Sequence, residues 1–309
     1  MVKYLNVILI SWLIVSCGYN PDKPYNDTPT SGKVNIAADE TLMPLARAQL
    51  DTFHGLYSYS AISMQYLSES DLFKALLNDS VKVIMATRRL NKAEVDYFKS
   101  RNLIPIVTKV AIDAITVILN KENPDSLLNI TQLKKILQGE ISSWKQLNKE
   151  SRLNDISFVF DNNGSSTFRY MQDSLMEGHA IPSNCFAVKS CADVIDYIEK
   201  NKNAMGVIGV SWISDQDDAT AMKFLSRIKV AEIGNENAVG SNEYFKPYQA
   251  YISLKQYPLI REVYMISREG RAGLGTGFVS FVAGDQGQRI VRLMGMLPAT
   301  MPVRIVKSY

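Results

Sequence analysis

The chain has 309 residues, with 34 lysines and arginines against 31 aspartates and glutamates, so its formal net charge is +3. This near-balance argues against nucleic acid as a partner, because nucleic-acid-binding proteins carry a marked excess of basic residues. The length is large for a single hydrophobic core and predicts two lobes. The two histidines, His54 and His179, lie far apart without carboxylates patterned around them. This arrangement argues against a metal site and against a histidine-based catalytic dyad.

The N-terminus has the composition of a targeting segment. The apolar run from Leu5 to Val15 follows a lysine and is shorter than the roughly 20 residues that a membrane-spanning helix needs. The tetrapeptide IVSC at positions 14–17 resembles a bacterial lipoprotein cleavage box, which predicts cleavage before Cys17 and a lipid such as palmitate on its thiol. A plain secretory signal with a chance cysteine is the alternative. Residues 1–16 are thus the expected signal peptide, and the polar residues 17–32 are an expected flexible tether.

These features place the protein in the bacterial cell envelope, anchored to a membrane by its lipid on the periplasmic or outer-membrane side. No further apolar run reaches 18 residues, so the mature chain is not expected to span a membrane. Cys185 and Cys191 remain after cleavage. In an oxidising compartment they would either form a local disulfide or stay as two small unpaired side chains, and the spacing favours neither.

Strands and helices are expected to alternate along the first half of the chain, because apolar runs predict strands and apolar residues at helical spacing predict helices. The expected strands are 34–37, 61–66, 82–85, 104–107 and 114–119. The expected helices are 42–53, 69–78 and 91–98. This alternation predicts right-handed βαβ units on a central sheet, and therefore an α/β protein.

The second half of the chain shows the same kinds of pattern. The expected strands are 156–160, 205–210, 231–233, 251–254 and 263–266. The expected helices are 131–137, 168–176, 193–201 and 275–293. These elements are sufficient for a second α/β lobe.

One segment combines a strand, a turn rich in hydroxyls and a helix. Gly164, Ser165, Ser166 and Thr167 follow the strand 156–160 directly and precede a helical pattern. The first turn of a helix has unpaired N–H groups and a partial positive charge, so it favours an anion, and hydroxyl groups add further donors. An ordinary N-cap is the alternative interpretation, since Ser and Thr before a helix usually have that role.

Several segments, in the same order, resemble the PstS-like periplasmic phosphate-binding proteins of ABC importers. Three of them resemble the family's ligand loops, and these are Asp39-Glu40-Thr41, Ala86-Thr87-Arg88 and Gly164-Ser165-Ser166-Thr167, the last standing where the family has Gly-Ser-Gly-Thr. Four others resemble its crossover strand with an Asn-Pro turn, its helix before a tryptophan, its glycine-containing strand and its final helix, and these are 113–124, 133–144, 204–209 and 277–295. The resemblance covers nearly all of residues 33–298.

The resemblance implies a two-lobed type II periplasmic-binding-protein fold, with two sheets flanked by helices and joined by a two-strand hinge. Residues 33–110 and 247–309 would form lobe 1, and residues 111–246 would form lobe 2. Phosphate or a similar small oxyanion would bind between the lobes, with an ABC permease as the partner. The implied ligand residues are Asp39, Thr41, Thr87, Arg88, Gly164, Ser165, Ser166 and Thr167. No cofactor, metal or catalytic residue is implied.

The chain departs from the family's pattern in its charges. The family's third ligand loop usually opens with an arginine that grips phosphate bidentately, six residues before the threonine, and this chain has Asp161 there. An acidic pair also stands in the first loop, which leaves Arg88 as the main nearby cation. Pairing of Arg88 with Glu94 is an equal alternative to ligand binding, and whether Arg169 reaches the site stays open.

Two other classes of function compete with solute binding. An envelope lipoprotein could use this fold to bind a protein or cell-wall component, and the missing arginine favours that interpretation. A hydrolase would need a histidine beside Ser165 or Ser166, yet His179 follows 13 to 14 residues later, which is ~20 Å at helical rise. The chain also lacks a Gly-x-Ser-x-Gly elbow. We therefore expect a binding protein and not an enzyme.

Overall fold

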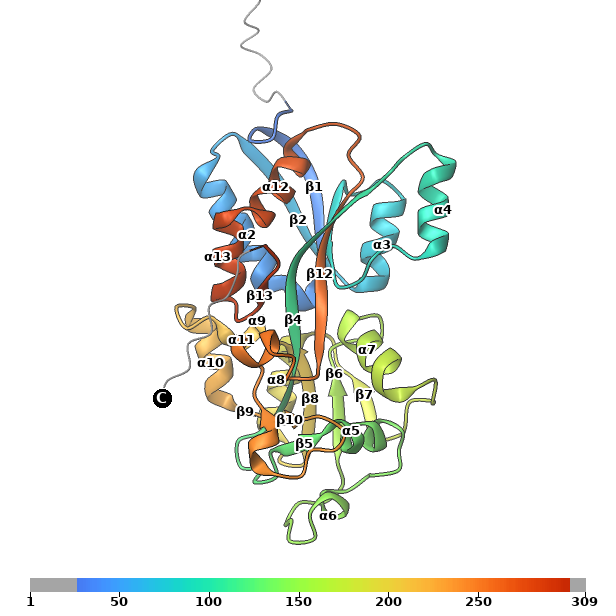
Figure 1. Ribbon diagram of the computed structural model, residues 1–309, viewed down its shortest axis with the longest axis vertical. Coiled ribbons are helices and arrows are strands. Elements are labelled where there is room, and N and C mark those ends of the chain that lie inside the picture. Colours follow the sequence, from blue (N-terminus) through green and yellow to red (C-terminus); the bar gives the residue numbers. More distant parts are fainter. Residues whose placement is uncertain (1–26, 301–309) are drawn as a thin grey trace, which may run out of the picture.

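The computed structural model describes residues 27–300. The expected signal peptide, Cys17 and residues 17–26 of the expected tether lie outside the described residues. The chain forms two α/β lobes, one above the other in Figure 1, and two long strands pass between them. These strands are β4 (Ile106–Asn120) and β12 (Ile260–Ser267), which pair in an antiparallel manner. The boundary expected at residue 110 falls inside β4, which contributes to both lobes.

One continuous path of strands connects the two lobes, in the order β2-β1-β3-β12-β4-β8-β6-β7, with β9 and β13 pairing on β4. The strands of lobe 1 besides β4 and β12 are β1 (Gly32–Asp39), β2 (Ser60–Leu67), β3 (Val83–Ala86) and β13 (Leu297–Pro298). Those of lobe 2 are β6 (Ser157–Phe160), β7 (Cys185–Ala187), β8 (Ala204–Gly209) and β9 (Ile228–Val230). A small separate sheet contains β5 (Leu127–Asn129), β10 (Glu232–Gly234) and β11 (Tyr244–Phe245).

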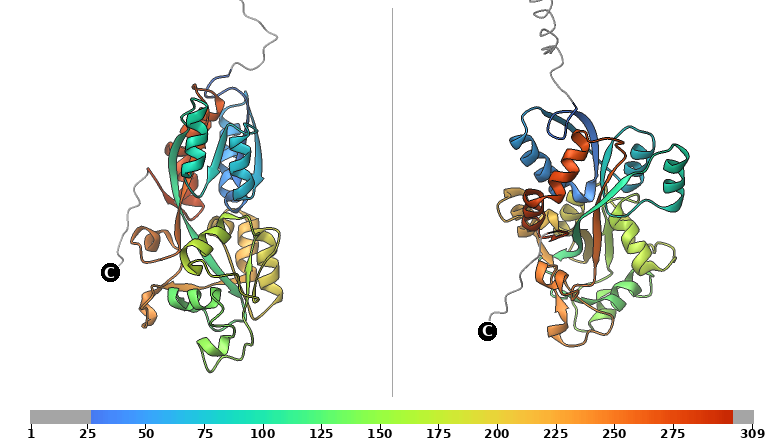
Figure 2. Two further views of the ribbon diagram at one scale, coloured as in Figure 1. Left: turned by 90° about the vertical axis from the view of Figure 1, so that its right-hand side faces the viewer. Right: turned by 45° about the horizontal axis from the view of Figure 1, so that its top comes forward.

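Helices surround the strands of both lobes, as the side view in Figure 2 shows. Lobe 1 carries the short η1 (Glu40–Leu42), α2 (Met43–Leu56), α3 (Glu69–Leu77), α4 (Lys92–Ser100), α12 (Leu274–Ala283) and α13 (Asp285–Leu293). Lobe 2 carries α5 (Ile130–Leu137), α6 (Trp144–Leu147), α7 (Ser166–Met171), the π-helical η2 (Gln172–Met176), α8 (Cys191–Lys200), α9 (Ser211–Ser214) and α10 (Ala219–Arg227). The return from lobe 2 contains η3 (Ser241–Glu243) and α11 (Gln249–Ser253). Within residues 27–300, no helix has the length and apolar character needed to cross a membrane.

Three helices of lobe 1 begin where a side chain satisfies one of their first N–H groups. Ser68 caps α3, and Asn91 with Glu94 forms a reciprocal capping box at α4. The N-terminus of α12 is capped by Asp27, whose Oδ1 accepts a hydrogen bond from the Leu274 N–H at 3.0 Å. The last residues of the expected tether therefore contact lobe 1.

The expected strand 251–254 is wrong, because these residues lie in and just after helix α11. Ile252 and Leu254 donate their N–H groups to the carbonyls of Tyr248 and Ala250, four residues earlier. The side chain of Ile252 is buried while Leu254 is half exposed. The apolar run 251–254 is short enough to fit either a strand or a helix, and in the helical turn it buries only one of its apolar side chains.

The expected final helix 275–293 is divided at Gly284, which has an extended backbone between α12 and α13. Gly287 then packs closely on the preceding helix, since a Cβ atom there would lie 2.4 Å from the Phe281 carbonyl oxygen. The expected strands 104–107 and 114–119 are parts of the single strand β4. From Asp113 onward β4 is buried at every residue, as expected for a strand covered on both faces.

Candidate functional site

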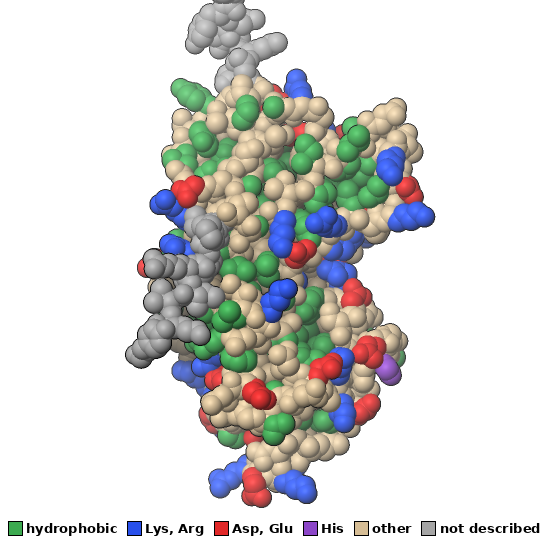
Figure 3. Space-filling view, viewed as in Figure 1, with side chains coloured by type: hydrophobic (Ala, Val, Ile, Leu, Met, Phe, Trp, Pro, Cys, Tyr) green, Lys and Arg blue, Asp and Glu red, His purple; other side chains and the backbone are tan. Residues whose placement is uncertain are grey.

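Three loops that follow strands of the two lobes converge at the lobe junction. Asp39 ends β1 and is followed by Thr41 in η1. Thr87 follows the last residue of β3, and Asp161 follows the last residue of β6. The loop after β6 leads into α7 through Ser165, which is the N-cap of that helix. The space-filling view shows a notch between the lobes with Lys and Arg side chains around it (Figure 3).

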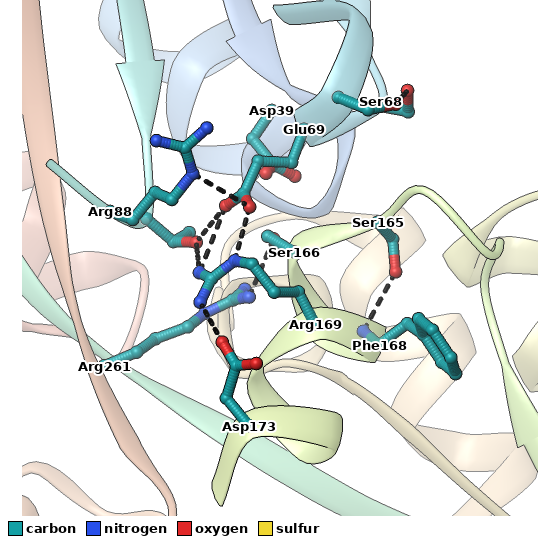
Figure 4. A network of polar contacts seen from close by, with 12 residues as sticks. Asp39, Ser68, Glu69, Arg88, Ser165, Ser166, Phe168, Arg169, Asp173 and Arg261 are labelled. Carbon is teal, nitrogen blue, oxygen red and sulfur yellow. Dashed lines mark hydrogen bonds and ion pairs between the residues drawn. The ribbon is translucent and has the colours of Figure 1, made fainter. Parts of the chain in front are cut away.

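The centre of the junction is the guanidinium group of Arg261, which comes from β12. Its Nε donates to Asp113 Oδ2 on β4 at 2.9 Å, one terminal nitrogen to Ser166 Oγ at 2.8 Å, and the other to Thr41 Oγ1 at 3.0 Å. Arg261 is 5% exposed, and Asp113, Ser166 and Thr41 are fully buried. One buried cation is therefore in contact with hydroxyl groups from both lobes. Figure 4 shows Arg261 with Ser166. We call Asp39, Thr41, Asp113, Ser166 and Arg261 the junction cluster.

Thr41 is held on several sides. Its hydroxyl and its backbone N–H both donate to Asp39 Oδ1, at 2.7 and 2.9 Å, and its Oγ1 lies 3.0 Å from Ser166 Oγ. Its carbonyl oxygen accepts a hydrogen bond from the indole of Trp212 in lobe 2 at 2.9 Å. Gly209 gives room for this packing, because a Cβ atom there would lie 3.1 Å from the same carbonyl oxygen.

Two buried polar atoms, one at the end of β1 and one in the first turn of α7, have no hydrogen-bond partner among the described residues. They are Oδ2 of Asp39 and the hydroxyl of Thr167, and both residues are fully buried. A carboxylate oxygen can only accept a hydrogen bond, whereas a hydroxyl can donate one. Because buried polar groups in folded proteins are nearly always paired, these two atoms, like the six other buried unpartnered atoms among residues 27–300, are candidates for a hydrogen bond to water or to a ligand.

Ser165 has the role of an ordinary N-cap, which was the alternative to an anion-binding group. Its Oγ accepts from the Phe168 N–H at 3.0 Å, and its hydroxyl donates to Asp161 Oδ1 at 2.5 Å. Asp161 thus points at the loop's own serine. Gly164 lies at the surface of contact between the lobes, since a Cβ atom there would be 2.9 Å from Ser70 Oγ in lobe 1.

The carboxyl groups at the junction hold their protons more tightly than free ones. Burial, with a smaller contribution from the charge of Asp39, raises the pKa of Asp161 to about 6 against the hydrogen bond from Ser165. Burial and the charges of Asp161 and Asp39 raise the pKa of Glu40 to about 7. Glu40 also accepts a hydrogen bond from Asn162 of lobe 2. At neutral pH the junction is therefore less negative than its carboxyl groups suggest.

Thr87 and Arg88 belong to a second network. Arg88 donates two hydrogen bonds of 2.8 Å to Glu94 and stacks 3.4 Å from the ring centroid of Phe73, which is the alternative that the sequence left open. Thr87 donates to Glu69 Oε2 at 3.0 Å. Arg169 reaches across from α7 to Glu69 and does not join Arg261. The sequence-predicted residues Thr41 and Ser166 are thus joined by a hydrogen bond, while Thr87 and Arg88 form theirs in the neighbouring network around Glu69.

Sequence reasoning missed Arg261 and Asp113. Their signal was weak but present, because each places a charged side chain within or beside an apolar strand pattern, Asp113 in VAIDAITVI and Arg261 in PLIREVYMI. A buried charge in such a pattern requires a partner. Only the pairing of β4 with β12 shows that the partner of each is the other.

Other candidate chemistries have less support in the described residues. Between residues 27 and 300, no group of three or more His, Cys, Asp and Glu side chains is placed to hold a metal ion. Cys185 and Cys191 are both buried and unpaired, so the structure contains the two free side chains and not the local disulfide. Burial raises the pKa of the Cys185 thiol to about 12, which makes it a poor nucleophile.

A family model matches most of the chain. Residues 23–286 match the model of the PBP superfamily domain. The chain is 21% identical over 287 residues to the phosphate-binding protein PstS of Staphylococcus epidermidis, covering 91% of this chain and 84% of that protein. It is 20% identical over 271 residues to protein SphX of Synechococcus elongatus, covering 86% of this chain and 77% of that protein.

Solved structures show the same fold. A phosphate ABC transporter substrate-binding protein of Clostridium perfringens, solved with bound phosphate, gives a TM-score of 0.72 at 20% identity, covering 87% of this chain and all of the other. A phosphate transport receptor of Vibrio cholerae gives 0.63 at 18% identity, covering 86% of this chain and all of the other. These likenesses confirm the predicted two-lobed α/β fold of the type II periplasmic-binding-protein class.

Proposed function

This chain belongs to the PBP superfamily, and we propose that it is an extracytoplasmic solute-binding protein that binds phosphate or a similar small oxyanion between its lobes. In this proposal a lipid on Cys17 anchors the protein to a membrane of the cell envelope, and an ABC permease receives the ligand. The relatives named as phosphate-binding proteins support the ligand class. The residues of the junction decide how this chain would bind it.

The observation that carries the proposal is the placement of Arg261. Its two terminal nitrogens contact Ser166 of lobe 2 and Thr41 of lobe 1, and Arg261 as a whole is only 5% exposed. A planar guanidinium with several donors suits the oxygen pairs of phosphate. Arg261 thus supplies, from the hinge strand β12, the cation that the loop after β6 lacks at Asp161. An anion bound here would contact both lobes and would favour their closure.

The acceptor groups of the junction specify the kind of oxyanion. Asp39 Oδ2 is buried without a donor, and a bare dianion offers none. Phosphate in its monohydrogen or dihydrogen form carries an O–H group that can donate to this oxygen, whereas sulfate at neutral pH carries no proton. The unpartnered hydroxyl of Thr167 can in turn donate to a phosphate oxygen. The site therefore offers both a donor set and one acceptor, and it favours a protonated oxyanion.

Thermal unfolding tests the proposal directly. The chain from residue 18 onward, which keeps the contacts of Asp27 with lobe 1, would be heated with and without millimolar phosphate or sulfate. A ligand at ~100 times its dissociation constant stabilises the native state by about 2.7 kcal/mol. We expect a clear rise in melting temperature with phosphate, a smaller one with sulfate, and none in an Arg261→Gln variant. If the melting temperature of Arg261→Gln rises with both anions as much as that of the wild type, the result contradicts the proposed site.

A second function is favoured by one observation. The guanidinium of Arg261 is already bonded to Asp113, Ser166 and Thr41, so the protein itself occupies its donors. An envelope lipoprotein that uses this fold to bind another protein or a cell-wall component would have such a filled junction. The absence of any anion-dependent shift in the melting temperature of the wild-type chain would favour this alternative, so the thermal unfolding experiment separates the two.

The lipid anchor has its own test. Cells expressing the chain would be labelled with a clickable palmitate analogue and the protein would be recovered by its tag. We expect label in the wild type and none in a Cys17→Ser variant, because the proposal places the lipid on that thiol. Label that persists in Cys17→Ser would contradict the proposed attachment site.

A further inference from the structure

We propose that Arg169 is a positioning residue that holds the two lobes closed through Glu69, so that the closed state is populated before any ligand binds. Arg169 lies in α7 of lobe 2, one turn after the hydroxyl residues of the junction, and Glu69 is the first residue of α3 in lobe 1. Figure 4 shows the guanidinium of Arg169 between the carboxyl groups of Glu69 and Asp173. We call Glu69, Thr87, Arg88, Arg169 and Asp173 the latch.

The contacts across the lobes are made by two donors of one guanidinium. Nε of Arg169 pairs with Glu69 Oε1, and a terminal nitrogen lies 3.2 Å from both Glu69 Oε2 and Thr87 Oγ1. The other terminal nitrogen lies 3.2 Å from Asp173 Oδ2 on the same helix segment. A bidentate pair of this kind has a fixed geometry, so it fixes the orientation of α7 as well as its distance from α3.

The burial of the latch makes it different from a surface ion pair. The side chain of Glu69 is 5% exposed, and that of Arg169 is 31% exposed. Glu69 also accepts from Thr87 and lies 3.5 Å from Nε of Arg88, both in lobe 1, and Arg169 adds the donors that come from lobe 2. Exposed pairs contribute little, whereas removing a partner of a buried carboxylate is costly because it leaves a buried charge less compensated.

The latch shares no hydrogen bond with the junction cluster among the described residues, although the charge of Glu69 acts on Asp39. Among residues 27–300, the hydrogen bonds of Glu69, Thr87 and Arg169 do not include Arg261, Thr41 or Ser166. The neighbouring backbone supports the same closure, since the Ser70 N–H points at the Gly164 carbonyl across the lobes at 3.4 Å. Closure through the latch therefore does not need an anion at Arg261, although an anion there would gain from lobes that are already in place.

The test measures the distance between the lobes. Spin labels on Ser100→Cys in lobe 1 and His179→Cys in lobe 2, both exposed positions, would report it by pulsed electron resonance in the full mature chain carrying Cys17→Ser. The native Cys185 and Cys191 are buried and would not take label. The comparison is between the otherwise wild-type chain, Arg169→Gln and Arg169→Lys, each without ligand.

We expect one short distance in the unliganded wild type, and in Arg169→Gln a longer distance with a closed population reduced about tenfold, as for a typical coupling between two states. Arg169→Lys keeps the charge and should recover part of the population that shows the short distance. Arg227→Gln is the matched control, because Arg227 pairs with Asp196 and Glu199 entirely within lobe 2. This control should keep the wild-type distance.

A long distance in the unliganded wild type, or an unchanged short distance in Arg169→Gln, would overturn the latch. The same distances would then be measured with phosphate added, and the interpretation of this second measurement rests on the proposed function. Phosphate should restore the short distance in Arg169→Gln and should bind that variant about tenfold more weakly than the wild type. If phosphate has no effect on any variant while the unliganded distances behave as expected, the ligand assignment fails and the latch stands.

Discussion

Arg261 and Asp113 are directly opposed residues of the antiparallel strands β12 and β4, and they form an ion pair with Nε and Oδ2 2.9 Å apart. Asp113 engages one edge of the guanidinium and leaves the two terminal nitrogens for Thr41 and Ser166. The strands that connect the lobes thus orient the one cation of the junction cluster. A movement of the lobes about these strands would change what Arg261 can reach.

Replacing Arg261 with Met should lower the free energy of unfolding by about 3–5 kcal/mol, because Asp113 would remain buried without its partner. Denaturant unfolding measures this loss. The double variant Arg261→Met/Asp113→Leu should lose less, since it removes the unpaired charge. Both variants should fail to bind phosphate. A double variant as unstable as the single one would mean that packing, and not the ion pair, dominates.

Thr167→Ala should separate binding from stability. The hydroxyl of Thr167 has no partner among the described residues, so its removal breaks no hydrogen bond and should cost less than about 1 kcal/mol of stability. Phosphate affinity should fall about tenfold, as expected for one lost hydrogen bond to a charged ligand. Calorimetric titration and denaturant unfolding give the two quantities.

Thr41→Ala is the matched contrast. Its hydroxyl contacts Asp39, Ser166 and Arg261, so the variant should lose about 1–3 kcal/mol of stability as well as affinity. Equal stability losses in the two threonine variants would show that the hydroxyl of Thr167 is paired within the protein. Full phosphate affinity in Thr167→Ala would show that this hydroxyl does not face the ligand.

The pH dependence of stability follows from the raised pKa values of Asp161, about 6, and Glu40, about 7. A raised folded-state pKa means that the folded protein retains protons that the unfolded chain has released. The stability that these two groups contribute is complete at a pH below their unfolded-state pKa values of 3.8 and 4.5. It is lost as the pH rises through their folded-state pKa values of about 6 and about 7. The melting temperature of the unliganded protein should therefore fall between about pH 4 and 7 through these two groups.

The variants Asp161→Asn and Glu40→Gln check this sign. The melting temperature of each variant should change less with pH over that range than that of the wild type, because each variant lacks one group whose ionisation is opposed by burial. Phosphate should also bind the wild type more weakly as these carboxyl groups ionise, and the variants at matched pH separate this effect from the ionisation of phosphate itself. A melting temperature that rises from pH 4 to 7 in parallel in all three proteins would contradict the account.

The buried cysteines give a further check on the fold. Cys185 begins β7 and Cys191 begins α8, and both side chains are buried and unpaired. Burial raises the pKa of both thiols, so a thiol reagent at neutral pH should modify neither at an appreciable rate until the protein unfolds. Mass spectrometry should find two modifiable thiols in denatured mature chain carrying Cys17→Ser. A disulfide between them would contradict the structure.

The α/β class and most element positions could be predicted from the sequence, because the apolar runs alternate with amphipathic segments along nearly the whole chain. The failures have local causes. Residues 251–254 are too short a run to separate strand from helix, and the split at Gly284 depends on how Gly287 packs against the preceding helix. The β-strands predicted at 104–107 and 114–119 could not be joined, because their continuity depends on pairing with β12.

The site was harder to predict for the same reason. Thr41 and Ser166 follow strands and could be found from local patterns, but 125 residues separate them and their contact depends on tertiary structure. Arg88 had two possible partners, and only the capping of α4 by Glu94 places that carboxylate within its reach. Arg261 lies far in sequence from every loop of the site, and nothing local indicates that its side chain reaches them.

The most direct test of the central claim is calorimetric titration of the wild-type chain and Arg261→Gln with phosphate, with sulfate as the matched anion, below pH 7 where Glu40 is protonated. The account predicts saturable binding of phosphate to the wild type, weaker binding of sulfate, and no binding of either to Arg261→Gln. Phosphate that binds the variant as tightly as the wild type, or wild type that binds neither anion, would contradict the assignment of Arg261 as the cation of an oxyanion site.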